Sequence, residues 1–248
     1  MIVKIAYFDT VAGVAGDMFV AALLDAGAPW ETIASIVDDL SLPEVRLEVR
    51  EVQTHGVRAR TFKVLDARSG MEVEKMESGI LRTPGMLLGM IEGSSLGPEV
   101  KRHAGSILMS LARAEAHVHS VPVEEVHFHE LGAMDTLVDI VAAASAVFAL
   151  GIECAFCSPV RVGKGTVLTA HGRLPVPAPA TARILEGVPC EAGPIAGELT
   201  TPTGAAIISH FSSGFGPMPS MIVDSEGFGA GSRDIGAPNV FRVLLGRS

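Results

Sequence analysis

The sequence predicts an α+β fold in which a mixed, largely antiparallel sheet is flanked by helices. Segments typical of strands and of helices interleave along the 248 residues without a strict βαβ repeat. One segment alternates apolar and polar residues, as the strands of an antiparallel hairpin do. The composition, with 48% hydrophobic residues and 27 glycines, is typical of a compact, loop-rich protein. No linker is evident, so we expect residues 1–248 to form one domain.

Residues 1–65 have clear sequence patterns that predict secondary structure. The expected elements are a buried strand at 2–8, helices at 17–25 and 29–40, and an antiparallel hairpin at 45–65. Gly27 ends the first helix and Pro29 begins the second. The alternation of the hairpin reverses about His55 and Gly56, which suit a tight turn. Residues 66–98 have weak periodicity and predict no definite element.

The second half begins with an amphipathic helix. Val100, Ala104 and Leu111 share one face of a helix expected over 99–116. A further helix is expected from Asp135 or Thr136 to Leu150, since Gly151 ends it. The remaining expected elements are an inner strand at 154–163, short helices at 175–187 and 201–211, and late strands at 221–234 and 239–246.

Charge and composition exclude several classes of protein. The formal net charge of −9 leaves no basic stripe for phosphate backbones, so we expect no nucleic-acid partner. The N-terminus lacks the layout of a signal peptide, and the apolar run 137–150 is too short to span a bilayer. Three cysteines suit a reducing compartment. Cys154 and Cys157 are interpreted as core residues, with a redox or metal role as the alternative. We therefore expect a cytoplasmic protein without a membrane partner.

Half of the eight histidines fall in one window, HVHSVPVEEVHFHE at 117–130. In an extended strand, residues two apart point to the same face, so each His-x-His pair would aim two imidazoles at one point. Neutral imidazole binds nickel, copper, zinc and iron(II), whereas the spacings of zinc fingers and zincins are missing. The alternative is that these are ordinary core histidines. The predicted metal ligands are His117, His119, His127, His129 and Glu130.

Carboxylates elsewhere extend this hypothesis. Asp135 and Asp139 lie one helical turn apart and would face the same pocket, although Asp135 is equally suited to cap a helix. In the loop FDTVAGVAGDM (8–18), Asp9 and Asp17 are candidate ligands for a hard cation. Asp17 is also a plausible N-cap.

Three glycine-containing loops indicate a phosphorylated or carboxylated substrate. The loop at 8–18 holds Gly13 and Gly16, whose small size lets a backbone approach a ligand, but it matches neither the Walker nor the G-x-G-x-x-G pattern. The other two offer Thr203 with Gly204, and Arg233 with Asp234. His171 lies on a proline-stiffened loop where it would contact a ligand. The alternative is that these loops are ordinary turns that bind no ligand.

Taken together, YFDTVAGVAGDM, VHFHELGAMDTLVDIV, AHGRLPVPAPAT, GELTTPTGAAI, GFGAGSRD and PNVFRVLLG closely resemble the nickel insertion (LarC) family of nickel-pincer cofactor synthesis. The resemblance spans residues 5–246. It implies a nickel insertase of the lyase class that inserts Ni²⁺ into pyridinium-3,5-bisthiocarboxylic acid mononucleotide in a CTP-dependent reaction.

The roles expected in this reaction follow from residue chemistry. Imidazoles would hold Ni²⁺, while Arg233 and amides near Thr203 and Gly13 would seat the phosphate. A histidine or carboxylate would take up the proton lost from the ring, and the candidates are Asp9, Asp17, Asp135 and His171.

Two departures from the family qualify the resemblance. Members often carry a histidine-rich segment after the hairpin, whereas residues 66–80 contain no histidine. Members also commonly continue past VLLG with a domain that handles CTP. We therefore expect either that a separate partner handles CTP with its divalent cation, or that this is a family member with altered activity. The alternatives are a nickel delivery or storage module without insertion activity, and a metal-dependent phosphate-ester enzyme. The sequence leaves a homo-oligomer open.

Overall fold

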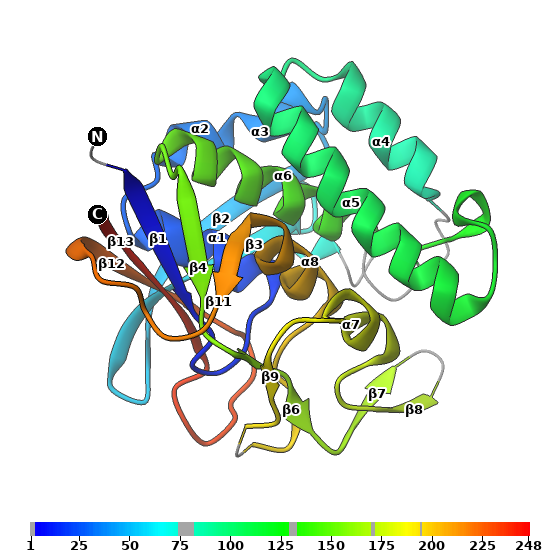
Figure 1. Ribbon diagram of the computed structural model, residues 1–248. Helices are drawn as coiled ribbons and strands as arrows, with labels where there is room; N and C mark the ends of the chain where they lie inside the picture. The colour runs from blue at the N-terminus through cyan, green and yellow to red at the C-terminus, as the bar shows by residue number, and fades with distance from the viewer. Residues whose placement is uncertain (1–2, 74–81, 129–132, 170–171, 194) are drawn as a thin grey trace.

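The computed structural model describes residues 3–73, 82–128, 133–169, 172–193 and 195–248. Its centre is a seven-stranded mixed sheet with the strand order β11-β4-β1-β13-β12-β3-β2 (Figure 1). These strands are β1 (Lys4–Asp9), β2 (Val45–Thr54), β3 (Val57–Asp66), β4 (Cys154–Cys157), β11 (Ser212–Phe215), β12 (Ile222–Ala230) and β13 (Val240–Arg247). The predicted α+β class with a mixed sheet is confirmed.

The longest strand pairings are antiparallel. They join β2 to β3, β12 to β13 and β1 to β13, whereas β4 is parallel to both β1 and β11. The hairpin turns at His55 and Gly56, both with positive φ, as the change in alternation predicts. A single parallel register pair between Gly229 and Arg60 joins the hairpin to the rest of the sheet.

Helices stack in layers on the sheet (Figure 1). Helix α1 packs against β12 and β3, α6 packs against α1, and α5 packs against α6. Because α1 and α6 are covered on nearly all sides, almost every side chain in them is apolar and buried. The helices are α1 (Gly16–Asp25), α2 (Trp30–Ala34), α3 (Ile36–Asp39), α4 (Pro84–Gly93), α5 (Pro98–His119), α6 (Ala133–Ala149), α7 (Pro179–Ile184) and α8 (Pro202–Phe211). No helix in the described ranges combines the length and apolar character that a membrane crossing requires.

Several expected boundaries are wrong. The helix expected at 29–40 is two short helices, α2 and α3, that meet at Ser35. Helix α4 lies in the segment for which no element was predicted. Helix α5 continues to His119 and ends where Ser120 takes a left-handed conformation, with φ 55°. Helix α6 begins at Ala133, so Asp135 lies inside its first turn and is not its N-cap.

The inner strand expected at 154–163 is also divided. After β4 the chain forms β5 (Val160–Arg161) and β6 (Gly163–Lys164), which leave the main sheet and pair with β9 (Cys190–Glu191) and β10 (Gly197–Glu198). The hairpin of β7 (Thr166–Thr169) and β8 (Gly172–Pro175) follows. Pairing partners that are more than 25 residues away are not visible in the local sequence pattern.

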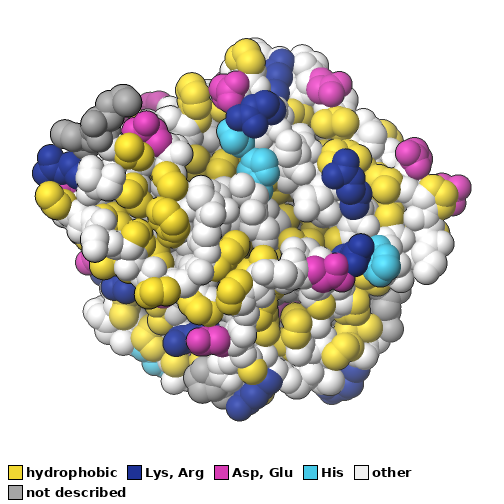
Figure 2. All heavy atoms as spheres, in the orientation of Figure 1, with side chains coloured by type: hydrophobic (Ala, Val, Ile, Leu, Met, Phe, Trp, Pro, Cys, Tyr) yellow, Lys and Arg dark blue, Asp and Glu magenta, His cyan; other side chains and the backbone are white. Residues whose placement is uncertain are grey.

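A polar contact links α5 to α8. His103 Nδ1 lies 2.7 Å from His210 Nε2, and Arg102 reaches both His103 and Glu99. Figure 2 shows histidine side chains beside basic and acidic ones on the face that α5 crosses. Burial, together with the charges of His103 and Arg102, lowers the pKa of His210 to about 4. His210 is therefore neutral in the folded protein at pH 7.

This contact predicts a loss of stability in mild acid. The unfolded chain binds a proton at His210 below about pH 6.5, whereas the folded protein resists protonation until about pH 4, so the free energy of unfolding falls between these values. Because the site is partly exposed, we expect a loss of about 1 kcal/mol. Urea unfolding at pH 7, 6 and 5 measures it. His210→Asn should show a flatter pH dependence than the wild type, and an identical slope would contradict the assignment.

Candidate functional site

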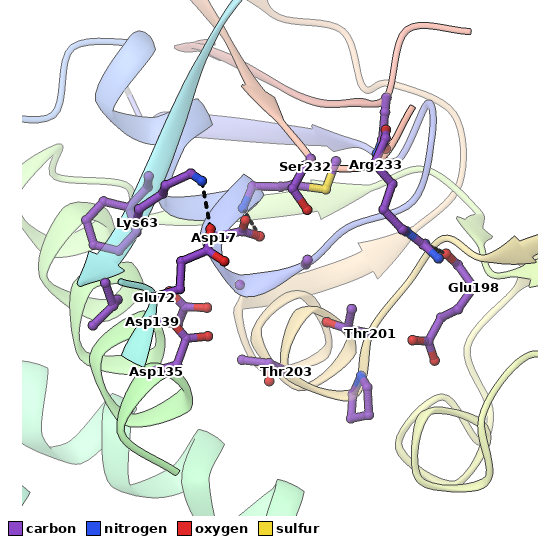
Figure 3. A pocket seen from close by; sticks show the side chains of 18 of the residues that line it. Asp17, Lys63, Glu72, Asp135, Asp139, Glu198, Thr201, Thr203, Ser232 and Arg233 are labelled. Carbon is purple, nitrogen blue, oxygen red and sulfur yellow. Dashed lines mark hydrogen bonds and ion pairs between the residues drawn. The ribbon is translucent and has the colours of Figure 1, made fainter. Parts of the chain in front are cut away.

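A cavity of about 380 Å³ lies where α1, α6 and α8 begin, beside β3 and the loop between β12 and β13 (Figure 3). Segments far apart in the sequence form its walls, and most of its charged side chains are acidic. The polar and charged lining residues are Asp17, Lys63, Glu72, Asp135, Asp139, Glu198, Thr201, Thr203, Ser232, Arg233 and Asn239.

The starts of α1 and α8 are held together by backbone contacts. The amide of Thr201 donates to the carbonyl of Val14 at 3.0 Å, and the amide of Val14 donates to Thr200 Oγ1 at 3.3 Å. A Cβ on Gly204 would lie 2.2 Å from the Val14 carbonyl oxygen, so only glycine permits this close approach. The two helix N-termini therefore open on the same cavity.

The other two predicted glycines also serve close packing. Gly13 has φ +82°, and a Cβ there would lie 2.1 Å from the Leu199 carbonyl oxygen. A Cβ on Gly16 would lie 2.3 Å from Asp139 Oδ2. Gly16 lines the cavity, whereas Gly13 and Gly204 support it from behind.

Asp135 and Asp139 both line the cavity, so the prediction that they face one pocket is confirmed. Asp139 is 4% exposed and lies beneath the start of α1, while Asp135 is only half-buried. Asp17 projects from the first turn of α1, where its Oδ1 accepts from the Met18 amide at 2.7 Å. The N-cap of α1 is Ala15, so interpreting Asp17 as an N-cap is wrong.

Glu72 and Glu198 add to the negative charge of the cavity. Among the described lining residues the cations are Lys63 and Arg233, and Lys63 pairs with Glu72 at 2.7 Å. Five carboxylates against two cations create a field that attracts a divalent cation.

Arg233 lies on a braced loop. Its guanidinium donates to the carbonyl of Glu198, and its own carbonyl accepts from Asn239 Nδ2 at 3.0 Å. The next residue, Asp234, accepts from the Gly236 amide at 2.9 Å and contacts His55 at 3.1 Å. The Gly236 amide and then His55 lower the pKa of Asp234. Asp234 thus fixes the loop, and it does not line the cavity among the described residues.

The histidine window is arranged differently from the prediction. His117 and His119 lie on the last turn of α5, not on a strand. Residues two apart on a helix project about 200° from each other, so the convergence predicted for this pair is wrong. His119 contacts Glu115 of the same helix at 3.5 Å.

Other predicted residues lie away from the cavity or outside the described residues. His127 is half-buried and is not in the described lining. Asp9 pairs with Arg242 on the neighbouring strand at 2.6 Å and is not in that lining either. His129, Glu130 and His171 fall outside the residues that the structure describes, so their roles stay predictions. Within the described ranges, no three His, Cys, Asp or Glu side chains are grouped as ligands for one ion.

The sequence patterns identified Gly16, Asp17, Asp135, Thr203 and Arg233, which the structure brings together. They missed Lys63, Glu72 and Glu198. Lys63 is one of many polar residues on an alternating strand, and Glu198 is separated from the TTPTG motif only by Leu199. Of these, only Glu198 stood beside a recognisable signal.

Comparison with known proteins gives a consistent result. The family described as nickel insertion protein matches residues 6–248. A protein of Citrifermentans bemidjiense that is named for nickel insertion is 48% identical over 246 residues, covering 99% of this chain and 62% of the relative.

Two further relatives are named pyridinium-3,5-bisthiocarboxylic acid mononucleotide nickel insertion protein. The one from Geobacillus kaustophilus is 44% identical over 98% of this chain and 60% of its own length. The one from Desulfitobacterium hafniense is 41% identical over 98% of this chain and 58% of its own length. The chain thus spans roughly three fifths of these relatives. No solved structure matches it significantly. With matching motifs, a matching family and relatives aligned over nearly its whole length, the chain belongs to the nickel insertion protein family.

Proposed function

We propose that this protein inserts Ni²⁺ into pyridinium-3,5-bisthiocarboxylic acid mononucleotide, and that the reaction takes place in the cavity described above. The observation that carries the proposal is the convergence of Asp17, Asp135 and Asp139 on one cavity onto which the N-terminus of α8 also opens. The names of the relatives supply the substrate. Nickel is here a substrate that passes through the site.

Carboxylates suit the delivery of nickel to this acceptor. The acceptor carries two thiocarboxylates on either side of a ring carbon, and sulfur is a softer ligand than carboxylate oxygen. Ni²⁺ held by Asp135 and Asp139 would pass readily to the two sulfur atoms. The protein then needs only to bring the ion and the acceptor together, since the acceptor supplies the final ligands.

Formation of the nickel–carbon bond releases the proton of the ring carbon. In this step the C–H bond breaks, its electron pair forms the bond to nickel, and the proton needs an acceptor. Asp135 is the best placed of the three aspartates. It is only half-buried while Asp139 is almost fully enclosed, and Asp17, which is also half-buried, already accepts from the Met18 amide. A positioned carboxylate acts as a general base when it reaches the proton directly or through one water.

The cavity's charge also supports capture of the metal. Its excess of carboxylates raises the local concentration of divalent cations. Arg233 and the start of α8 provide the opposite charge for an anionic part of the acceptor. We place the reaction in the cytoplasm, since Cys154, Cys157 and Cys190 are all free thiols, as suits a reducing compartment.

The test is transfer of nickel to purified acceptor, followed by the absorption and mass of the product. We expect one Ni²⁺ per acceptor molecule and no release of phosphate from the acceptor. Nickel binding without transfer, with or without added CTP and a partner protein, would favour a delivery or storage module. Phosphate release without nickel would favour a phosphate-ester enzyme. The involvement of a CTP-handling partner stays a prediction, which nickel transfer with and without CTP and the partner tests. A homo-oligomer also stays a prediction, which light scattering tests.

A further inference from the structure

Thr203 is a buried polar residue at the cavity wall with unused hydrogen-bonding capacity. It is the second residue of α8 and only 6% exposed, yet it lines the cavity (Figure 3). Within the described part of the chain, neither its hydroxyl nor its backbone amide has a hydrogen-bond partner. Buried polar groups nearly always have a hydrogen-bond partner. The Thr203 hydroxyl and amide, which face a cavity without one among the described residues, therefore indicate a ligand.

The helix that carries Thr203 is suited to an anion. Helix α8 has ten residues, and its first turn contains no acidic residue. The N-cap Thr201 accepts from the amide of Gly204 at 3.2 Å, which leaves the Thr203 amide directed out of the helix. By contrast, the first turn of α1 carries Asp17, whose carboxylate already accepts from an amide there. Of these two helix ends at the cavity, α8 is the one without its own negative charge.

Arg233 supplies a full positive charge to the same cavity from another wall (Figure 3). One of its N–H groups donates to the Glu198 carbonyl, which anchors the side chain. Its other N–H groups have no hydrogen-bond partner among the residues described. A guanidinium held in this way binds phosphate through paired hydrogen bonds.

We propose that the Thr203 hydroxyl and amide, together with Arg233, form a subsite for the phosphate monoester of a pyridinium mononucleotide. This inference rests on the proposed function, because the word mononucleotide in the names of the relatives is what identifies the anion. A cavity of about 380 Å³ falls in the range of small-ligand sites. The phosphate would then bind at Thr203 and Arg233, and Asp135 and Asp139 would remain available to bind Ni²⁺.

The experiment compares two commercial probes by calorimetry on the intact chain. Nicotinic acid mononucleotide carries the phosphate, and nicotinic acid riboside has the same ring and ribose without it. The wild type should bind the mononucleotide at least about tenfold more tightly than the riboside. Inorganic phosphate, as a third probe, shows whether the subsite also accepts the free anion.

Variants then show which residues cause the difference in affinity between the mononucleotide and the riboside. Thr203→Val, which removes only the hydroxyl, should weaken binding of the mononucleotide about tenfold and leave the riboside unchanged. Thr203→Ser should retain wild-type binding. Thr61→Val, at a half-buried position on β3 outside the described cavity lining, is the matched control. Should Thr203→Val fold poorly, Arg233→Gln gives a second test with the same expected pattern.

Equal affinity of the wild type for both probes would overturn the subsite, as would an equal loss of both probes in Thr203→Val. Nickel transfer separates this result from the proposed function. If the protein discriminates between the probes but transfers no nickel, the proposed function fails and the subsite stands. If nickel transfer is intact and Thr203→Val leaves the KM for the acceptor unchanged, the subsite fails and the function stands.

Discussion

Asp135→Asn is expected to slow nickel insertion by about a hundredfold, the usual contribution of a positioned acid or base. The amide has nearly the same shape as the carboxylate, but it carries no charge and cannot take up the ring proton. Because Asp135 is half-buried at the cavity wall, the substitution should leave the fold intact. Single-turnover transfer of Ni²⁺ to saturating acceptor measures the effect directly.

Two companion variants sharpen this prediction. Asp139→Asn should also slow insertion and in addition lower the unfolding temperature, because Asp139 is almost completely buried against Gly16. Asp38→Asn changes an exposed aspartate on α3 and should leave the rate unchanged. A wild-type rate for Asp135→Asn would show that the proton goes elsewhere. A slow rate for the exposed control would show that net charge alone is responsible.

Gly204→Ala is expected to destabilise the protein by about 3 kcal/mol, since the added methyl would overlap backbone atoms that cannot move independently. Its Cβ would lie 2.2 Å from the Val14 carbonyl oxygen and 3.0 Å from Ala15 Cα. The starts of α1 and α8 would have to separate, which would also widen the cavity. Chemical unfolding with urea gives the change in the free energy of unfolding.

Gly89→Ala is the matched control for Gly204→Ala. Gly89 is an exposed residue in the middle of α4, and a Cβ there meets no atom within 4 Å. Alanine is a better helix former than glycine by about 1 kcal/mol, so this variant should gain stability. If Gly204→Ala were as stable as the wild type, the starts of α1 and α8 could not be in the close contact described above.

Local sequence signals predicted the parts of the fold that local contacts determine. The alternation of apolar and polar residues predicted the β2–β3 hairpin, and the spacing of apolar residues predicted α5 and α6. The division of residues 154–164 among three strands was not predicted, because β5 and β6 pair with segments much later in the chain. Helix α5 extends to His119, beyond its predicted end, because the His-x-His spacing alone does not distinguish a strand from a helix.

The site was predictable where a residue stood at a recognisable turn or helix start. Asp17, Thr203 and Arg233 were identified in this way, and Asp135 with Asp139 through their helical spacing. Lys63 and Glu72 reach the cavity only because β3 lies beside α1, a tertiary arrangement that no local pattern encodes. The described cavity lining is rich in carboxylates and contains no histidine, so it differs from the imidazole site that the histidine window predicts.

Anomalous X-ray scattering at the nickel edge, from crystals grown with Ni²⁺ and a pyridinium mononucleotide, tests the location of the chemistry most directly. We expect a nickel peak beside the Asp135 and Asp139 carboxylates, with the phosphate of the nucleotide at Thr203 and Arg233. A cavity without nickel, together with a peak at the histidines of residues 117–129, would contradict it.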